Sequence, residues 1–253
     1  MKSYLPKIIK KKDYYIFYYK SVNFKFFNYD FKAIDLIKIL KLKSELEIFN
    51  FYLKYKNYYN SYADVGANVG AHSLFASRVF KKVYSYEPLI KHYNALKKNI
   101  LLNSFNNIKT FNRAINISNK KSFLLELINN STATHLTTAH RSVYGKTSVT
   151  QVRCTDIQAL NLKLDLIKLD VEGLEHKLLK KINFNLRFSD FLIEIHNYKN
   201  SREIFKKLWK YKKINLYKLK NLRLESIKSF KDMPISTTDG TLLITKFFYE
   251  KNN

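Results

Sequence analysis

Two strand-like runs in the second half of the chain end in side chains that can transfer protons or hold a cation. One run stops at Asp170, with Glu172 just beyond it, and the other contains Glu194 and stops at His196. Alternate residues of a strand share a face, so Glu194 and His196 are expected on the same side. Imidazole titrates near neutral pH, and carboxylates bind hard divalent cations. These residues predict acid–base or metal-assisted chemistry on a hydroxyl group.

A glycine-containing turn earlier in the chain is typical of a nucleotide-type ligand loop. It follows a predicted strand and opens a predicted helix, where glycine lets the backbone approach a ligand. Asn68 stands where a dinucleotide fingerprint has its middle glycine, and the Asp64 carboxylate would repel a pyrophosphate. S-Adenosylmethionine carries no phosphate and has a cationic amino group and a sulfonium, so it is the predicted cofactor. The binding residues predicted here are Asp64, Gly66, Asn68, Gly70 and Ser73.

A second predicted strand ends in an acid that suits a ribose. Glu87 follows Tyr86 and precedes Pro88, about 20 residues beyond the glycine turn, where a carboxylate can accept hydrogen bonds from both ribose hydroxyls. The alternative is a solvated loop glutamate. The third strand ends near Asn112 and Ala114, which are expected to border the adenine.

Four motifs in this order resemble the FkbM family of methyltransferases. They are Asp64-Val65-Gly66-Ala67-Asn68-Val69-Gly70, Tyr86-Glu87-Pro88, Ile167-Lys168-Leu169-Asp170-Val171-Glu172-Gly173-Leu174-Glu175 and Ile193-Glu194-Ile195-His196. The resemblance covers residues 61–247. It implies a class I methyltransferase fold, which is a Rossmann-like doubly wound α/β sheet with an antiparallel last strand. It also implies O-methylation of sugar or polyketide-type hydroxyls.

A narrower resemblance concerns the substrate. The Lys-rich and aromatic-rich composition is similar to that of bacterial capsule-assembly enzymes, which include methyltransferases of nucleotide-activated heptoses. This resemblance implies a sugar or nucleotide-sugar substrate.

The acceptor half leaves two mechanisms open. In one, His196 is the general base that removes the proton of the acceptor hydroxyl. In the other, Asp170 and His196, with Glu194 or Glu172, hold Mg²⁺ or Mn²⁺ that lowers the pKa of that hydroxyl. Lys168 is expected to face Glu194. The structural alternative is a buried Lys168–Glu194 ion pair, with His196 merely capping a strand.

Alternating strand-like and helix-like runs must position these residues. Strands are predicted at 61–65, 82–86, 107–112, 165–169 and 190–195, with a last one at 241–247. Helices are predicted at 71–80, 89–103, 173–182 and 201–211. This alternation predicts a parallel sheet with right-handed crossovers.

Residues 113–156 interrupt that alternation. Runs at 122–128 and 148–153 look extended and flank a polar stretch, 129–146, which is a candidate active-site loop. His135 and His140 lie in this stretch and are candidates to touch the acceptor, although solvated loop histidines are the more common case.

The chain divides into a predicted extension and a predicted catalytic domain. Residues 1–60 contain no glycine and are interpreted as a cap or oligomerisation extension, with short strands within 13–27 and a helical pattern from Ile34 through Leu46 to Phe49. Residues 61–253 are interpreted as the methyltransferase domain. As an oligomerisation segment, the extension would form the contact of a homodimer.

The formal charge of +26 would suit a polyanionic partner, but the wealth of Lys, Asn, Ile, Tyr and Phe is also typical of an AT-rich coding bias. A nucleic-acid methyltransferase is the rival enzyme. It is disfavoured because no Asn/Asp-Pro-Pro-Tyr motif occurs, and because Glu194 and His196 stand where ribose methyltransferases are expected to place lysine. A non-catalytic basic binding module is the third alternative.

The cellular location is predicted from two features that are not found in the sequence, a membrane-spanning run and a secretory signal. No apolar run approaches the roughly 20 residues that span a bilayer, and the basic start has no apolar signal region, so a cytoplasmic enzyme is expected. The single cysteine, Cys154, is expected to be a packed strand residue.

Overall fold

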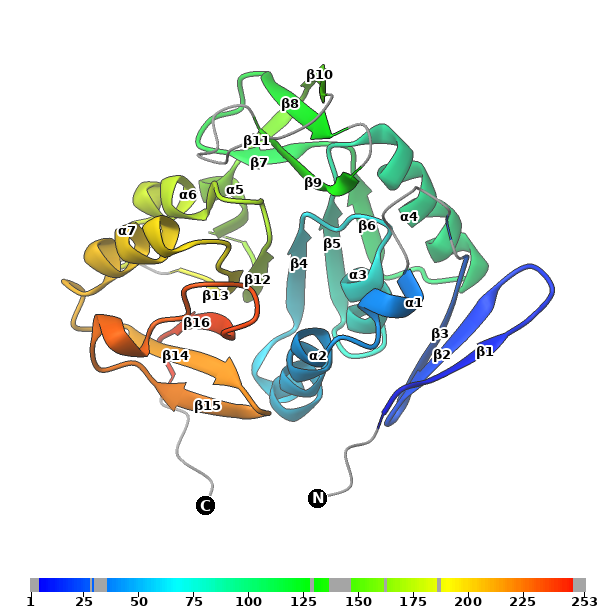
Figure 1. Ribbon diagram of the computed structural model, residues 1–253, viewed down its shortest axis with the longest axis horizontal. Coiled ribbons are helices and arrows are strands. Elements are labelled where there is room, and N and C mark those ends of the chain that lie inside the picture. Colours follow the sequence, from blue (N-terminus) through cyan, green and yellow to red (C-terminus); the bar gives the residue numbers. More distant parts are fainter. Residues whose placement is uncertain are drawn as a thin grey trace.

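An eight-stranded mixed sheet forms the centre of the computed structural model, which describes residues 5–27, 29, 36–127, 130–136, 147–161, 163–185 and 188–247 (Figure 1). Its strands, in spatial order, are β15 (Arg223–Ser226), β14 (Asn215–Lys220), β16 (Thr241–Thr245), β13 (Asp190–Glu194), β12 (Leu166–Leu169), β4 (Ser61–Val65), β5 (Lys82–Tyr86) and β6 (Ile108–Phe111). Strands β13, β12, β4, β5 and β6 run parallel, whereas β16 is antiparallel to both neighbours. The predicted class I methyltransferase sheet, with its antiparallel last strand, is confirmed.

Helices cover both faces of this sheet because its strands alternate between two cores. On one face α2 (Lys43–Tyr55), α3 (Ala71–Ser77) and α4 (Ile90–Leu102) pack against residues such as Tyr62 and Leu166. On the other face α5 (Ile157–Asn161), α6 (Glu175–Lys181) and α7 (Tyr198–Leu208) pack against Ile167 and Ile193. All five strands and four helices predicted between residues 61 and 211 are present, with boundaries displaced by a few residues.

A second layer of strands lies over the carboxyl ends of β4 and β5 (Figure 1). Here β8 (Ser122–Leu127) pairs with both β10 (Thr147–Val152) and β9 (Asn130–Leu136), and β7 (Ala114–Asn116) pairs with β11 (Cys154–Asp156). Residues 130–136 were expected within a loop. Their polar composition concealed a strand that is specified by backbone pairing with β8 rather than by hydrophobic alternation. Residues 137–146, with His140, and the His135 side chain lie outside the described part.

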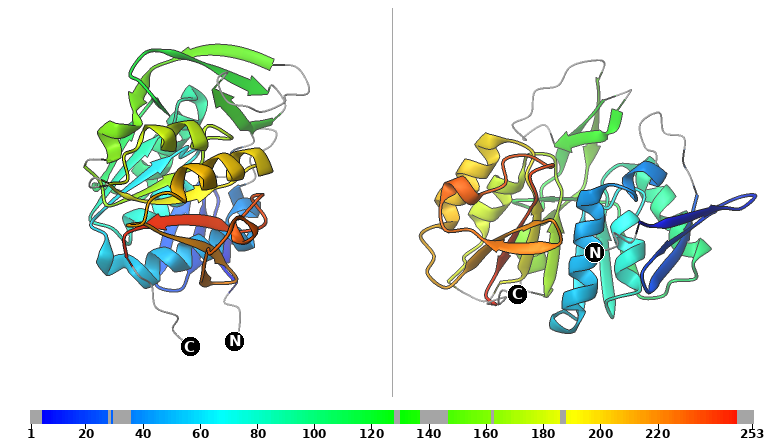
Figure 2. Two further views of the ribbon diagram at one scale, coloured as in Figure 1. Left: turned by 90° about the vertical axis from the view of Figure 1, so that its left-hand side faces the viewer. Right: turned by 60° about the horizontal axis from the view of Figure 1, so that its bottom comes forward.

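The first 60 residues share a core with the rest of the chain. A meander of β1 (Lys7–Lys10), β2 (Tyr15–Tyr19) and β3 (Val22–Phe26) lies beside α3 and α4 (Figure 2), and α1 (Leu36–Ile39) and the 3-10 helix η1 (Lys56–Tyr58) flank α2. Phe17 and Phe24 pack with Phe49 of α2 and Phe75 of α3. The rings of Phe49 and Phe75 stack with centroids 4.1 Å apart.

The C-terminal part contains elements that were not predicted. The β14–β15 hairpin and the 3-10 helix η2 (Phe230–Asp232) precede β16, and α7 starts at Tyr198 because the Asn197 side chain accepts a hydrogen bond from the backbone N–H of Asn200 at 2.9 Å. Cys154 is buried in β11. Among the helices in the described ranges, none combines the length and the apolar composition needed to cross a membrane.

Candidate active site

A pocket at the carboxyl ends of β4, β5 and β12 gathers half of the predicted site residues. Of those predicted for the cofactor, Gly66, Asn68, Glu87, Pro88 and Ala114 line it. Asp170 and Glu172, predicted for the acceptor, line the same pocket. Leu124 of β8 and Leu136 of β9 close it from the second layer of strands.

The glycine turn is shaped by close backbone approach. Gly66 has a φ of 85°, and a Cβ atom there would lie 2.0 Å from the carbonyl oxygen of Asp170. Only glycine therefore allows the end of β4 to run this close to the end of β12. Gly70, with a φ of 101°, precedes α3 outside the pocket lining, and a Cβ there would lie 2.6 Å from Cδ1 of Leu96.

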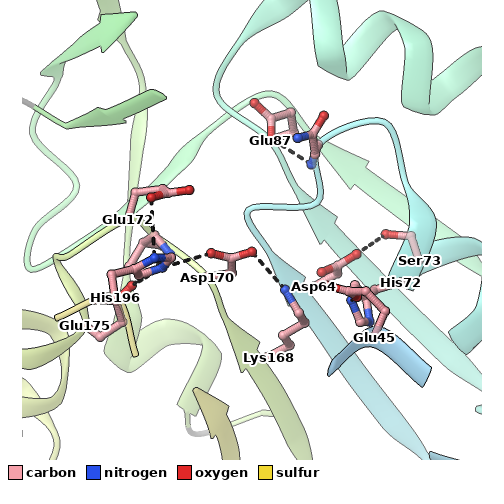
Figure 3. A network of polar contacts seen from close by, with 12 residues as sticks. Glu45, Asp64, His72, Ser73, Glu87, Lys168, Asp170, Glu172, Glu175 and His196 are labelled. Atoms are coloured by element: carbon pink, nitrogen blue, oxygen red, sulfur yellow. Dashed lines mark hydrogen bonds and ion pairs between the residues drawn. The ribbon is translucent and has the colours of Figure 1, made fainter. Parts of the chain in front are cut away.

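Two backbone amide groups hold the carboxylate of Glu87 in place. Its two carboxylate oxygens accept hydrogen bonds from the N–H groups of Asn68 and Leu89, each at 2.8 Å (Figure 3). Burial raises the pKa of this carboxyl to about 7. Asn112, predicted to border the adenine, donates its side-chain amide to the carbonyl oxygens of Glu87 and Pro88, so it braces this turn.

Asp64 is buried behind the glycine turn, and one of its two carboxylate oxygens accepts a hydrogen bond. Its Oδ2 accepts a hydrogen bond of 2.6 Å from Ser73, whose hydroxyl also contacts Ser85. Its Oδ1 and the Oδ1 of Asn68 are buried without a hydrogen-bond partner among the described residues. A buried acceptor without a donor is costly, so both oxygens suit a ligand that brings N–H or O–H groups. Ser73 orients Asp64 and does not line the pocket.

The acidic residues converge on His196 because β12 and β13 are parallel neighbours (Figure 3). Nε2 of His196 lies 3.2 Å from Asp170 and 3.5 Å from Glu175, and Nδ1 lies 3.5 Å from Glu172. Ligand atoms of Asp170, Glu172 and His196 all lie within 4.8 Å of one another. Glu194, the predicted third member, is not part of this set, whereas Glu172, its predicted substitute, is.

Lys168 has a different partner from the one expected. Its Nζ lies 3.1 Å from Asp170, the next residue on the same face of β12, whereas Glu194 lies beyond ion-pair distance. Burial would lower the pKa of Lys168, but Asp170 and Glu194 raise it well above its usual value. The buried Lys168–Glu194 pair of the structural alternative is therefore replaced by a Lys168–Asp170 pair.

The protonation states follow from this arrangement. Burial alone would lower the pKa of His196, but the hydrogen bond and charge of Asp170, with Glu175 and Glu194, raise it to about 9. Burial, and then the charge of Asp170, raise the pKa of Glu194 to about 8. Against its own burial, Lys168 and His196 hold the pKa of Asp170 well below its usual range. At neutral pH the cluster thus contains an imidazolium, an ionised Asp170 and a protonated Glu194.

Four further polar residues surround the site without having been assigned from the sequence. Glu175 is fully buried and accepts hydrogen bonds from the N–H groups of Val171 and Gly173, so it fixes the loop that carries Glu172. His92 lines the pocket 3.9 Å from Glu87, and burial lowers its pKa to about 3, so it is a neutral neighbour. Glu175 was visible as the last residue of the third motif, whereas His92 carries no local signal.

The other two residues join the N-terminal extension to the site. Glu45 of α2 bonds to His72 in the first turn of α3, and both lie close to Asp64 and Lys168 (Figure 3). Nδ1 of His72 lies 3.1 Å from the Tyr52 hydroxyl. The Glu45 charge acts on both Lys168 and Glu194. No spacing in the sequence predicts this contact between separate helices.

The sequence of this site can now be set against known proteins. Residues 64–219 match the family model of the methyltransferase FkbM domain, from Asp64 near the end of β4 to Leu219 near the end of β14. The chain belongs to the FkbM methyltransferase family. It is accordingly an S-adenosylmethionine-dependent methyltransferase, as the four motifs predicted.

Solved structures of similar arrangement are distant in sequence from this FkbM methyltransferase. An S-adenosylmethionine-dependent O-methyltransferase from Thermotoga maritima is 13% identical, with 96% of each chain covered and a TM-score of 0.46. M. jannaschii TYW2, solved in complex with AdoMet, is 15% identical, with 94% of this chain and 87% of that chain covered and a TM-score of 0.45. A comparison with curated proteins finds no match.

Proposed function

We propose that this FkbM methyltransferase methylates a hydroxyl group of a nucleotide-activated sugar used in capsule or surface polysaccharide synthesis. The observation that carries the proposal is the cluster of Asp170, Glu172 and His196 at the edge of the cofactor pocket. A sugar hydroxyl is a weak acid that needs help to lose its proton, whereas a neutral amine is already nucleophilic. An acid–histidine cluster of this kind supports oxygen as the acceptor atom.

The pocket residues fit S-adenosylmethionine. Glu87 has lone pairs left for the two ribose hydroxyls after accepting its two backbone N–H groups. Asp64, which lies behind the pocket lining, has a buried oxygen without a donor, which suits the cationic amino group. Pro88 and Ala114 line the pocket and would border the adenine, and Gly66 would let the backbone approach the cofactor. When bound, the cofactor supplies an electrophilic methyl group on its sulfonium.

Of the two mechanisms, a divalent cation is better supported than a direct base. The carboxylates around His196 raise its pKa to about 9, so its proton must leave before the imidazole can act as a base or as a metal ligand. A divalent cation can take the place of that proton because it balances the charge of the same carboxylates. Asp170, Glu172 and His196 offer two carboxylates and an imidazole within 4.8 Å, a donor set that suits Mg²⁺ or Mn²⁺. A cation held there would lower the pKa of the acceptor hydroxyl. Lys168 would keep Asp170 ionised.

The experiment is an acceptor screen with the purified chain. Nucleotide-activated sugars are incubated with S-adenosylmethionine and Mg²⁺ or Mn²⁺, and products are examined by mass spectrometry for the gain of one methyl group. We expect methylation that stops on chelation and returns with the cation. Glu172→Gln should reduce it strongly, whereas Glu203→Gln, which removes a carboxylate on α7 outside the site, should not.

The outcomes separate the alternatives. Methylation that persists fully after chelation would exclude the cation and leave His196 as a direct base. Methylation of none of the sugars, together with transfer to another acceptor class by the same preparation, would contradict the proposed substrate.

A further inference from the structure

A second groove adjoins the cofactor pocket. It lies between the start of α4, the end of β6 and strand β10, and has a volume of about 700 Å³. Its walls are formed by residues 88–91, 110–113 and 150–153, with Leu124 of β8. Pro88, Arg113 and Leu124 line both this groove and the cofactor pocket. The two spaces therefore meet along one wall.

The charged side chains that are described in this groove are all basic. Lys91, Arg113 and Arg153 line it, and none of its described lining residues is acidic. In the part of the chain that the structure describes, neither Arg113 nor Arg153 has a carboxylate within ion-pair distance. Since several other basic side chains on the molecule do pair with acids, Arg113 and Arg153 give the groove positive charge that no described carboxylate balances.

The two arginines are held side by side by the fold. Each immediately precedes one of two parallel paired strands, because Ala114 of β7 is in register with Cys154 of β11. The N–H of Ala114 donates to the carbonyl oxygen of Arg153 at 2.9 Å, so the two backbones are neighbours. The positive charges of the two arginines repel one another, and an anion bound between them would offset that repulsion.

The chemistry that suits these side chains is that of phosphate. Guanidinium groups bind phosphate oxygens through paired N–H donors, and a lysine adds a compact positive charge. Thr110, Thr150 and Gln151 line the same groove with hydroxyl and amide groups. A volume of this order accommodates a nucleotide-sized ligand.

We propose that this groove binds the diphosphate of the nucleotide-activated acceptor through Lys91, Arg113 and Arg153. An acceptor anchored there would pass the shared wall of Pro88, Arg113 and Leu124 to reach the pocket that Asp170 and Glu172 also line. The identity of the acceptor rests on the proposed function, whereas the affinity of the groove for a diphosphate does not.

The test is equilibrium binding to the full chain by calorimetry, with UDP, GDP and inorganic pyrophosphate as probes. Arg153→Gln is the informative variant because Arg153 lines the groove but not the cofactor pocket. We expect it to weaken nucleoside diphosphate binding about tenfold or more, since it removes charge-assisted hydrogen bonds, and to leave S-adenosylmethionine affinity unchanged. The matched control, Lys98→Gln, removes one exposed charge from α4 outside the groove and should change neither.

Four results decide the proposal. Absence of binding by all three probes, or equal weakening by Arg153→Gln and Lys98→Gln, would overturn it. Displacement of the diphosphate by single-stranded RNA of higher affinity, at a salt concentration that removes non-specific RNA binding, would assign the groove to a nucleic-acid backbone instead, and would also overturn it. Diphosphate binding lost in Arg153→Gln, without methylation of any nucleotide sugar, would uphold the groove and contradict the proposed function.

Discussion

His196 lies within 3.5 Å of carboxylates from Asp170, Glu172 and Glu175. The imidazolium of His196 and the ammonium of Lys168 cannot neutralise the carboxylates of Asp170, Glu172, Glu175 and Glu194 together, so part of the negative charge must be removed by protonation or balanced by another cation. The excess of negative charge raises the pKa of His196 to about 9 and contributes to raising that of Glu194 to about 8. A divalent cation would balance the same negative charge, so the cluster is suited to hold one.

The first prediction concerns this cluster. His196→Ala should lower turnover by about 10²–10⁴-fold, because it removes either a cation ligand or a base that acts during the reaction. The dissociation constant for S-adenosylmethionine, measured by calorimetry, should stay close to that of the unaltered chain. Near-normal turnover in both His196→Ala and Asp170→Ala would mean that the acceptor chemistry lies elsewhere.

The second prediction uses the ionisation of Glu87. In the proposed site the ribose hydroxyls would donate to the Glu87 carboxylate, so the cofactor would prefer the ionised form of a group whose pKa is about 7. As pH falls below about 7, affinity should therefore drop towards tenfold per pH unit, and above it the affinity should level off. Calorimetry from about pH 5.5 to 7.5 measures this window.

Glu87→Gln is the control for that titration. It should bind S-adenosylmethionine more weakly by roughly 1.5–3 kcal/mol at neutral pH, and its affinity should not vary across the window. If the variant followed the pH curve of the unaltered chain, Glu87 would not be the group that titrates.

Where a local motif fixes a backbone position, residues predicted from the sequence do line the pocket, and their contacts with the cofactor stay a prediction. Gly66, Asn68 and Glu87 were found because strand, turn and helix follow one another in order. The contact of Glu45 with His72 could not be predicted, since it depends on how α2 packs against α3. Asn112 was predicted near the pocket, but its hydrogen bonds to the Glu87–Pro88 turn depend on tertiary packing.

Among the elements, α2 connects the N-terminal extension to the cofactor half. Phe49 is fully buried and stacks on Phe75 of α3, the helix that starts after the glycine turn. The extension therefore supports the element that follows the cofactor loop. Its further role as a cap or oligomerisation segment stays a prediction.

The third prediction tests this packing. Phe49→Ala should lower the free energy of unfolding by about 3–5 kcal/mol, because it leaves a cavity among aromatic rings. Leu42→Ala, at a half-exposed position just before α2, should change it by no more than about 0.5 kcal/mol. Denaturant unfolding compares the two. A small loss in Phe49→Ala would show that the extension is only loosely attached.

Element prediction succeeded for strands and helices of strong periodicity and failed where pairing alone specifies structure. The parallel strands are apolar runs, which are recognisable in the sequence. Strand β9 is polar and exists because β8 lies beside it, and the β14–β15 hairpin pairs through residues on each side of Asn221 and Leu222, both at positive φ. Cross-strand partners of this kind are not encoded in local alternation.

For the whole molecule, a formal charge of +26 favours non-specific association with polyanions. The fourth prediction is that single-stranded RNA binds at low salt and dissociates steeply as salt rises, without being methylated. Filter binding over a salt series, followed by a methyl-transfer assay on the same RNA, measures both. Salt-resistant binding together with methyl transfer to RNA would favour the rival nucleic-acid enzyme.

The most direct measurement of the proposed activity uses S-adenosylmethionine labelled with carbon-13 in its transferable methyl group. After reaction with a nucleotide-activated sugar, the labelled methyl is located in the product by nuclear magnetic resonance. We expect a methoxyl signal correlated to one sugar carbon, formed by the unaltered chain and reduced by about 10²–10⁴-fold in His196→Ala. A label on nitrogen, a label on nucleic acid, or a methoxyl signal undiminished in His196→Ala would contradict the role proposed for this site.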